Sequence, residues 1–120
     1  DSGKLLVVRY QDRVVGGILC ASYKGKVLYE WFVCGEELHS EHVYPSVMST
    51  WAAIEYAMDH GYDRFDFMGA GKPGEAYGVR DFKLRFGGTL VKYGRFSYIQ
   101  YPMLYQIGKW AIKIQKYLKQ

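Results

Sequence analysis

The last third of the chain contains no acidic residue. Residues 82–120 carry eight lysine and arginine side chains, whereas residues 1–81 carry eight basic and all twelve acidic ones. A basic segment of this kind favours contact with an anionic partner such as nucleic acid, a phosphate group or an anionic bilayer. A solvated basic helix explains the same charges, and charge alone does not separate the two explanations.

Long apolar runs are also missing. The longest, such as residues 14–21, are far shorter than the roughly 20 residues that span a bilayer. The N-terminus lacks the charged start, apolar stretch and small-residue cleavage site of a signal peptide. The chain of 120 residues fits one domain and begins with aspartate, which suggests a processed or excised piece of a longer protein. We expect a soluble, cytoplasmic protein.

Cysteine is scarce, with only Cys20 and Cys34 present. They flank a predicted hairpin turn at residues 24–25. In the register that this turn predicts, the two lie about 17 Å apart along the sheet and on opposite faces. A disulfide is therefore excluded, and two buried thiols are expected.

Apolar periodicity predicts an α+β domain with a mostly antiparallel central sheet and the order β-β-β-α-β-α-β-α. Strand 13–23 is apolar on both faces, so we expect it to be central and covered on both sides. Gly16 and Gly17 within it predict a bulge or a close approach by another backbone or by a ligand. The expected strands are 4–10, 13–23, 26–34, 64–68 and 89–98.

Three helices are expected, over residues 45–60, 75–86 and from Pro102 almost to the C-terminus. The first begins at Pro45 and ends at Gly61. Its larger apolar side chains form one stripe, which consists of Val47, Trp51, Ile54 and Met58. The last helix carries Leu104, Ile107, Ala111, Ile114 and Leu118 on one side, and Tyr105, Lys109, Lys113 and Lys116 on the other.

The segment 69–74 matches G-x-G-x-x-G, the dinucleotide-binding pattern, but its context excludes that function. The pattern requires an acidic residue about 20 positions later to bind the ribose, and the sequence contains none after Asp81. Pro73 also lies where the helix should begin. The spacing also differs from that of a Walker A loop. One remaining interpretation is a substrate-binding loop, in which Gly69 and Gly71 let a ligand approach the backbone and Lys72 supplies a positive charge. An ordinary flexible connection is the alternative.

Metal and nucleophile sites are poorly supported. His39 and His42 stand three apart in an acidic loop without a further histidine pair or cysteine, so we predict no metal site. No serine lies in a G-x-S-x-G elbow, and neither cysteine has a base beside it in the sequence. We expect no covalent intermediate and no bound cofactor.

Residues 78–88 combine core anchors with cations. Phe82 and Phe86 are four apart on one helical face, and Arg80 and Lys83 are three apart on a neighbouring face, where they could converge on an anion. An amphipathic helix with solvated bases is the alternative.

Three segments together resemble the C-terminal, GNAT-type lobe of the Fem family, which adds amino acids to peptidoglycan precursors. They are WAAIEYAMDHGYDRFDF at 51–67, the Gly-Ala-Gly loop at 69–71, and F-K-x-x-F-G-G at 82–88 with Tyr-Gly at 93–94. The resemblance covers roughly residues 4–105. It implies a GNAT-like fold and acyl or aminoacyl transfer to an amine, with aminoacyl-tRNA as donor and a cell-wall precursor as acceptor.

In that family the lysine of this element stabilises the acyl-transfer transition state, which here implies Lys83, with the backbone N–H of Phe82 or Lys83 nearby. We expect Lys83 to lie near a cleft, with Phe82 and Phe86 largely buried. Its replacement by alanine should lower turnover by orders of magnitude and leave thermal stability nearly unchanged. Arg80, Lys72 and Arg85 are our candidates for contacts to an anionic substrate.

A complete GNAT lobe begins with a strand and two helices, and this chain begins at the second strand. Fem enzymes have two such lobes. The resemblance therefore implies that residues 1–120 form a single lobe, the C-terminal part of a two-lobe enzyme whose N-terminal lobe is missing here. The basic C-terminal helix is a candidate for peripheral contact with the inner face of the membrane.

Two other functions compete with Fem-like transfer. One is acetyl-CoA-dependent N-acetylation, and the other is a non-catalytic binding lobe. An acetyl-CoA-dependent GNAT binds pyrophosphate through a Q/R-x-x-G-x-G/A loop. The corresponding residues 35–45 lack that pattern and carry three carboxylates. We therefore predict weak or absent acetyl-CoA binding.

Overall fold

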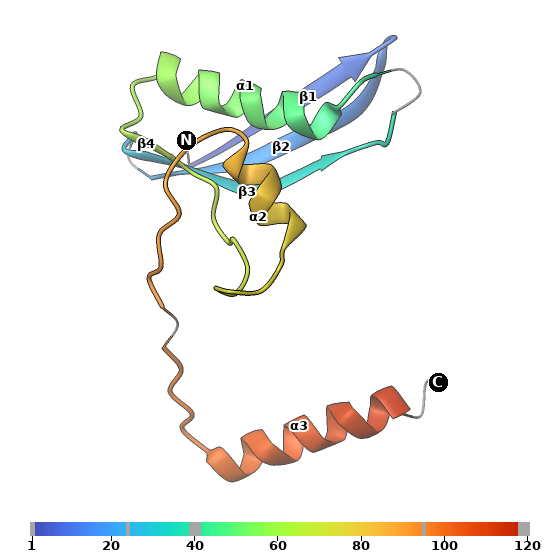
Figure 1. Ribbon diagram of the computed structural model, residues 1–120, viewed down its shortest axis with the longest axis vertical. Coiled ribbons are helices and arrows are strands. Elements are labelled where there is room, and N and C mark those ends of the chain that lie inside the picture. The colour runs from blue at the N-terminus through green and yellow to red at the C-terminus, as the bar shows by residue number, and fades with distance from the viewer. Residues whose placement is uncertain (1, 24, 39–41, 95, 118–120) are drawn as a thin grey trace. The chain divides into compact units, whose positions relative to one another are not determined.

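The computed structural model describes residues 2–23, 25–38, 42–94 and 96–117. The chain divides into two compact units, Asp1–Leu90 and Val91–Gln120, each described here by itself. That residues 1–120 form one lobe of a two-lobe protein stays a prediction. The first unit contains β1 (Gly3–Tyr10), β2 (Arg13–Tyr23), β3 (Val27–Gly35), α1 (Pro45–Asp59), β4 (Arg64–Asp66) and α2 (Gly78–Leu84), and the second contains α3 (Pro102–Tyr117) (Figure 1).

The first unit is built on a sheet with the order β1-β2-β3-β4, and α1 packs on one face of it (Figure 1). The β1–β2 and β2–β3 pairs are antiparallel, and β4 pairs parallel to β3. Gln11 and Asp12 have φ of 47° and 63°, as a two-residue type I′ hairpin turn requires. The α+β fold with a mostly antiparallel sheet is confirmed.

Two irregularities shape the central strand β2. Opposite β1, the register shifts around Val15, and opposite β3 it shifts around Trp31. A Cβ on Gly16 would lie 2.7 Å from Cβ of Pro45, and a Cβ on Gly17 would lie 2.7 Å from the carbonyl oxygen of Leu6. The predicted bulge and close approach are both present, so α1 begins almost in contact with the sheet.

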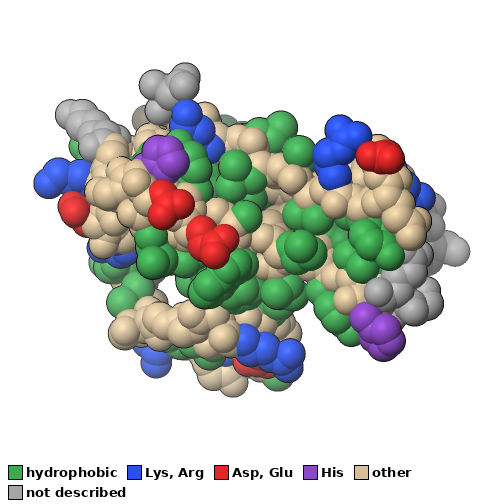
Figure 2. Space-filling model, turned by 90° about the horizontal axis from the view of Figure 1, so that it is seen from above, with side chains coloured by type: hydrophobic (Ala, Val, Ile, Leu, Met, Phe, Trp, Pro, Cys, Tyr) green, Lys and Arg blue, Asp and Glu red, His purple; other side chains and the backbone are tan. Residues whose placement is uncertain are grey.

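This close approach decides which face of α1 is buried. The buried side chains are small, namely Pro45, Ser49, Thr50, Ala53 and Ala57. The predicted stripe of larger residues mostly points away from the sheet, with Val47, Trp51 and Met58 exposed. Seen from the side of α1, hydrophobic side chains accordingly reach the surface (Figure 2). The stripe is therefore not the face that packs on the sheet, because large side chains do not fit where helix and sheet backbones lie so close.

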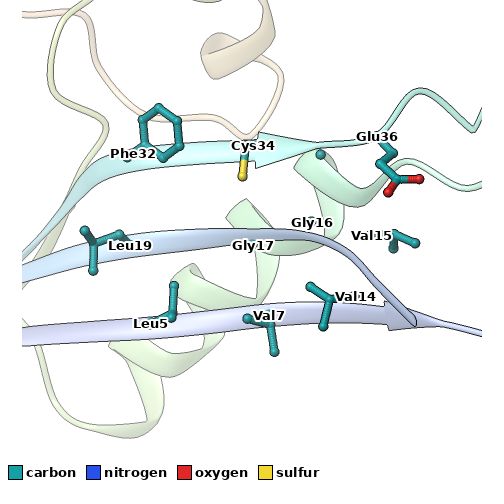
Figure 3. Close-up of a pocket in the computed structure, with 11 residues that line it drawn as sticks. Leu5, Val7, Val14, Val15, Gly16, Gly17, Leu19, Phe32, Cys34 and Glu36 are labelled. Atoms are coloured by element: carbon teal, nitrogen blue, oxygen red, sulfur yellow. The ribbon is translucent and has the colours of Figure 1, made fainter. Parts of the chain in front are cut away.

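The opposite face of the sheet is open in this unit. Leu5, Val7 and Phe32 are exposed around a shallow groove of about 410 Å³ whose floor includes Gly17 (Figure 3). Within the first unit, α1 therefore covers one face of β2, and cover on its other face stays a prediction. Cys34 lies on this open face and is exposed, so the expectation of two buried thiols was wrong for it. Both cysteines are free, as predicted.

The C-terminal part departs most from the predicted order. Residues 89–94 and 96–98 form no strand, and the observed order is β-β-β-α-β-α-α. The alternation in this segment favours a strand, but a strand persists only where a neighbour pairs with its backbone. The helix predicted at 75–86 is shorter, and α3 begins at Pro102 as predicted. In the described part of the chain, no helix is long and apolar enough to cross a membrane.

Candidate active site

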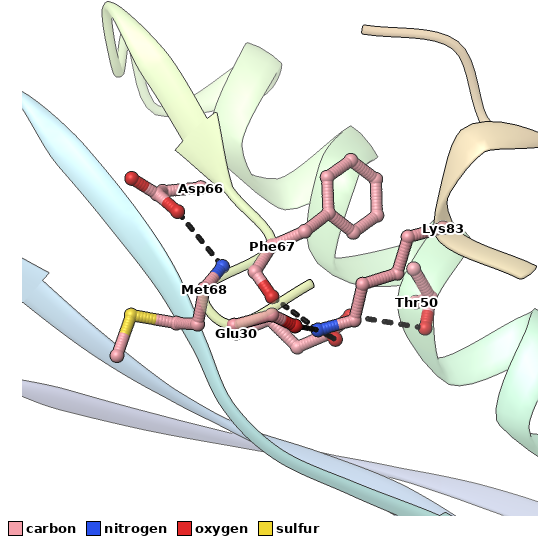
Figure 4. A network of polar contacts seen from close by, with 7 residues as sticks. Glu30, Thr50, Asp66, Phe67, Met68 and Lys83 are labelled. Carbon is pink, nitrogen blue, oxygen red and sulfur yellow. Dashed lines mark hydrogen bonds and ion pairs between the residues drawn. The ribbon is translucent and has the colours of Figure 1, made fainter. Parts of the chain in front are cut away.

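Lys83 is held inside the first unit by three groups, one from β3 and two from the loop after β4 (Figure 4). It extends from α2, and its Nζ lies 3.1 Å from Oε1 of Glu30 on β3. The same ammonium group donates to the carbonyl oxygen of Phe67, and to that of Gly69 at 3.2 Å, in the loop after β4. The side chain of Lys83 is 13% exposed and that of Glu30 is 3% exposed. As expected, Lys83 does not project into open solvent. The cleft that we expected beside it stays a prediction.

Glu30 is the buried carboxylate of this cluster. It lies opposite Cys20 on β2 and immediately before the bulge at Trp31. Thr50 of α1 donates from its hydroxyl to Oε2 of Glu30 at 3.4 Å. Burial raises the pKa of Glu30, and the nearby Lys83 and Thr50 only partly oppose that effect. The attraction between Glu30 and Lys83 thus offsets the free-energy cost of burying the two charges, and the pair adds little net stability.

Arg80, one turn before Lys83 on α2, contacts backbone rather than an anion. Its Nε donates to the carbonyl oxygen of Ala70 at 2.8 Å, and its two terminal nitrogens donate to those of Glu75 and Lys72. Arg80 and Lys83 do converge, as their spacing suggested, but on five carbonyl oxygens of residues 67–75. Together they fix the glycine-containing loop against α2.

A chain of aromatic contacts attaches α2 to the core. Phe65, which packs on the buried cluster, contacts Phe67 with ring centroids 5.0 Å apart. Phe67 meets Phe86 at 6.0 Å, and Phe86 meets Phe82 at 5.2 Å. Phe82 and Phe86 are half-buried, whereas the sequence predicted that they would be largely buried. This contact chain fixes the position from which Lys83 extends.

The remaining predicted site residues lie at the periphery. Lys72 is exposed and pairs with Glu75 at 3.5 Å, a contact worth little in water. Arg85 is exposed at the end of α2. Gly71 has a φ of 71°, and the ring of Tyr77 lies where a Cβ would be, so this position requires glycine. Whether these residues and the N–H of Phe82 contact a substrate stays a prediction.

The other titratable groups do not form a second centre. Burial and the charge of Glu30 raise the pKa of Cys20 to about 11, so its thiol stays protonated and is a poor nucleophile at neutral pH. His39 lies outside the described residues, so the geometry of the candidate His39–His42 pair is not defined. Within residues 2–23, 25–38, 42–94 and 96–117, no cluster of three potential metal ligands is found.

Sequence reasoning missed Glu30 and Thr50. Glu30 is the only charged residue between Val27 and Cys34, and a charge in an otherwise apolar strand is a signal of a buried partner. Nothing in the sequence identified Thr50, which lies on the small-residue face of α1. Glu30, Thr50 and Lys83 come from β3, α1 and α2, which are far apart in the sequence. No local sequence pattern predicts a contact between them.

The raised pKa of Glu30 predicts a specific pH dependence of stability. A carboxyl whose pKa is higher in the folded than in the unfolded state binds more protons when folded. Relative to Glu30→Gln, the wild-type protein should therefore lose stability as the pH rises from about 4.3, the ordinary value for glutamate. The loss should level off above the folded-state pKa. Urea unfolding of both proteins between pH 4 and pH 8 measures this difference, and a difference independent of pH would contradict it.

The family comparison agrees with this architecture. The family model of the acetyltransferase (GNAT) domain matches residues 1–84. This range includes Lys83 and the residues around it, namely Glu30, Thr50, Phe67 and Gly69. Searches among curated proteins and among solved structures found no match. Acyl transfer from a donor to an amine acceptor is the general activity that such a domain supports. With 84 of its 120 residues matched, the chain belongs to the GNAT acetyltransferase domain family.

Proposed function

We propose that this GNAT domain transfers an aminoacyl group to an amine acceptor, in the manner of the Fem family, with Lys83 polarising the donor carbonyl. The observation that carries the proposal is a little-exposed ammonium group, anchored by Glu30 beside a glycine-containing loop. The resemblance of residues 82–88 to the Fem element supports the same residue. With aminoacyl-tRNA as donor and a cell-wall precursor as acceptor, the reaction would take place in the cytoplasm.

The chemistry needs a cation at the carbonyl oxygen of the donor. When an amine attacks an ester, its nitrogen forms a bond to the carbonyl carbon and negative charge develops on the oxygen. A fixed donor at that oxygen contributes about 3–4 kcal/mol to transition-state stabilisation. Departure of the tRNA hydroxyl then regenerates the carbonyl, and the amine proton leaves with that hydroxyl or with solvent.

Lys83 can meet this requirement by exchanging one partner. An ammonium group has three donors, and in this structure they meet Glu30, Phe67 and Gly69. The contact to Gly69 is exposed and 3.2 Å long, so the donor carbonyl can replace it at low cost. Glu30 would keep the ammonium group in place during this exchange, as a positioning residue.

Two other functions each have an observation in their favour. Acetyl-CoA-dependent acetylation is favoured by the description of the matching family. Against it, residues 35–45 carry Glu36, Glu37 and Glu41, and each carboxylate at close range costs a bound phosphate about 1 kcal/mol even in water. A non-catalytic lobe is favoured by the fact that all three donors of Lys83 already have internal partners.

A parallel assay separates the donors. The intact protein, with any further lobe, should transfer an amino acid from charged tRNA to an amine acceptor and show no saturable calorimetric signal with acetyl-CoA. Product formation is followed by mass spectrometry. Because phosphate contacts release counterions, the apparent affinity for tRNA should fall steeply between 50 and 200 mM salt, by roughly 10³-fold for six contacts. Tight acetyl-CoA binding would overturn the choice of donor, and no transfer with either donor would favour the non-catalytic lobe.

A further inference from the structure

The second unit contains an amphipathic helix with an unusually basic polar face. Along α3 the apolar side chains recur at helical spacing, and the narrow opposite face carries Lys109, Lys113 and Lys116. No aspartate or glutamate occurs anywhere after Asp81. Nothing in the sequence of this unit therefore neutralises its lysines.

The apolar side chains of α3 and of the segment before it are exposed. Trp110 is 71% exposed and Met103 is 81% exposed, and Phe96 and Tyr98, before the helix, are more than 90% exposed. An apolar surface of this extent ordinarily marks an interaction site.

The composition of this surface favours lipid over protein. Protein interfaces are depleted in lysine, and α3 has three lysines within eight residues. Helices that lie in the headgroup region of a bilayer carry lysine on a strongly polar face, and tryptophan and leucine-like side chains on the other. Tyrosine and tryptophan also prefer this depth of the membrane. Both aromatic types are present here, with Tyr105, Trp110 and Tyr117 on the helix.

We propose that α3, with the aromatic residues that precede it, binds in the plane of an anionic bilayer surface. The apolar side would enter the boundary between headgroups and acyl chains. The lysines would reach up to anionic headgroups along their aliphatic stems. Lys109 already lies against an aromatic ring, with its Nζ 5.5 Å from the ring centroid of Tyr105. This inference does not depend on the acyl-transfer reaction.

Flotation of the full chain with lipid vesicles tests the proposal. Vesicles of phosphatidylcholine alone are compared with vesicles containing a quarter phosphatidylglycerol. We expect binding to the anionic vesicles only. Replacing Lys109 and Lys113 with glutamine should weaken it roughly 30-fold, because each lysine near such a surface contributes about a fivefold gain in affinity. The matched control is Lys26→Gln with Arg64→Gln, which removes two exposed charges from the first unit.

Tryptophan emission supplies a second readout. In a variant with Trp31→Phe and Trp51→Phe, Trp110 is the remaining tryptophan and should shift to the blue only with anionic vesicles. The proposal is overturned if the full chain does not float with anionic vesicles, or if the Lys109/Lys113 variant binds as well as the control variant. A blue shift without lipid that depends on protein concentration would overturn it in favour of a second copy of the chain on α3.

Discussion

Replacing Lys83 with methionine is expected to lower the rate of acyl transfer about 10²–10³-fold in the intact enzyme. The physical reason is the loss of a fixed cation at the carbonyl oxygen where negative charge develops. Methionine preserves much of the aliphatic length of Lys83, so the cavity left behind is small. The rate is measured as kcat/KM for transfer from the charged donor, and a variant that retains most of its rate would refute the catalytic role.

The structure changes the expected effect of this substitution on stability. From sequence alone we expected Lys83→Ala to leave stability nearly unchanged. Because Glu30 is 3% exposed and paired with Lys83, removal of the ammonium group leaves a buried carboxylate without its partner. Breaking such a pair typically costs about 3–5 kcal/mol. Lys83→Met should therefore lower the midpoint of urea unfolding, and the loss should shrink at low pH, where Glu30 is protonated.

A double variant separates catalysis from stability. In Lys83→Met with Glu30→Gln, the uncompensated charge is gone and the amide can still accept from Thr50, so most of the lost stability should return. If Lys83 polarises the donor, transfer stays slow in this restabilised protein. Recovery of the rate together with stability would show that Lys83 only supports the structure, as a non-catalytic lobe requires.

The parts of the fold that were predicted correctly from sequence depend on the conformational preferences of residues close together in the chain. The hairpin turn at Gln11 and Asp12 was located by the apolar strands on either side of it, and both residues have the positive φ that such a turn requires. The helix α1 begins at Pro45 and ends at Asp59, two residues before Gly61, as the preferences of proline and glycine predict. Three strands and the α+β class followed from the apolar periodicity between these turn and helix-end residues. The GNAT-like fold followed from the family resemblance.

The parts that failed depend on tertiary contacts. Counting large apolar residues in α1 selected the stripe of Trp51 and Met58, but the close approach near Gly16 requires small side chains. The predicted strand at 89–98 has suitable side chains, yet no described residue of it pairs in the sheet. The site divides in the same way. Lys83 came from a family resemblance, and its partner Glu30 became visible only when β3, α1 and α2 were brought together.

Arg80 has backbone partners that its spacing in the sequence did not predict. Its position one turn from Lys83 predicted a shared anion, whereas in the structure its donors meet the carbonyl oxygens of Ala70, Lys72 and Glu75. A guanidinium group with its donors occupied in this way organises backbone. Its role as a substrate contact stays a prediction. Its contacts to the loop lead to a second prediction, which can be measured directly.

Arg80→Ala is expected to release the loop of residues 69–75 without unfolding the sheet. Each hydrogen bond to a charged donor contributes about 1.5–3 kcal/mol, so the loss of three such bonds should free the loop and raise the rate at which a nonspecific protease cleaves it by at least 10²-fold. Cleavage within β2 and α1 should remain near that of the wild type. Arg85→Ala is the matched control, because Arg85 lies on the same helix and is exposed.

Arg80→Ala should also affect acyl transfer, because the loop that Arg80 holds contributes a contact to Lys83. Its contact to Gly69 lies in the same loop, so a mobile loop weakens the positioning of the ammonium group. We expect Arg80→Ala to lower kcat/KM about 10-fold or more, and Arg80→Lys to restore little of it, because one ammonium group cannot reach three separated carbonyls. If cleavage of the loop is unchanged while transfer is lost, Arg80 acts on the substrate instead. If both are unchanged, the loop does not need this anchor.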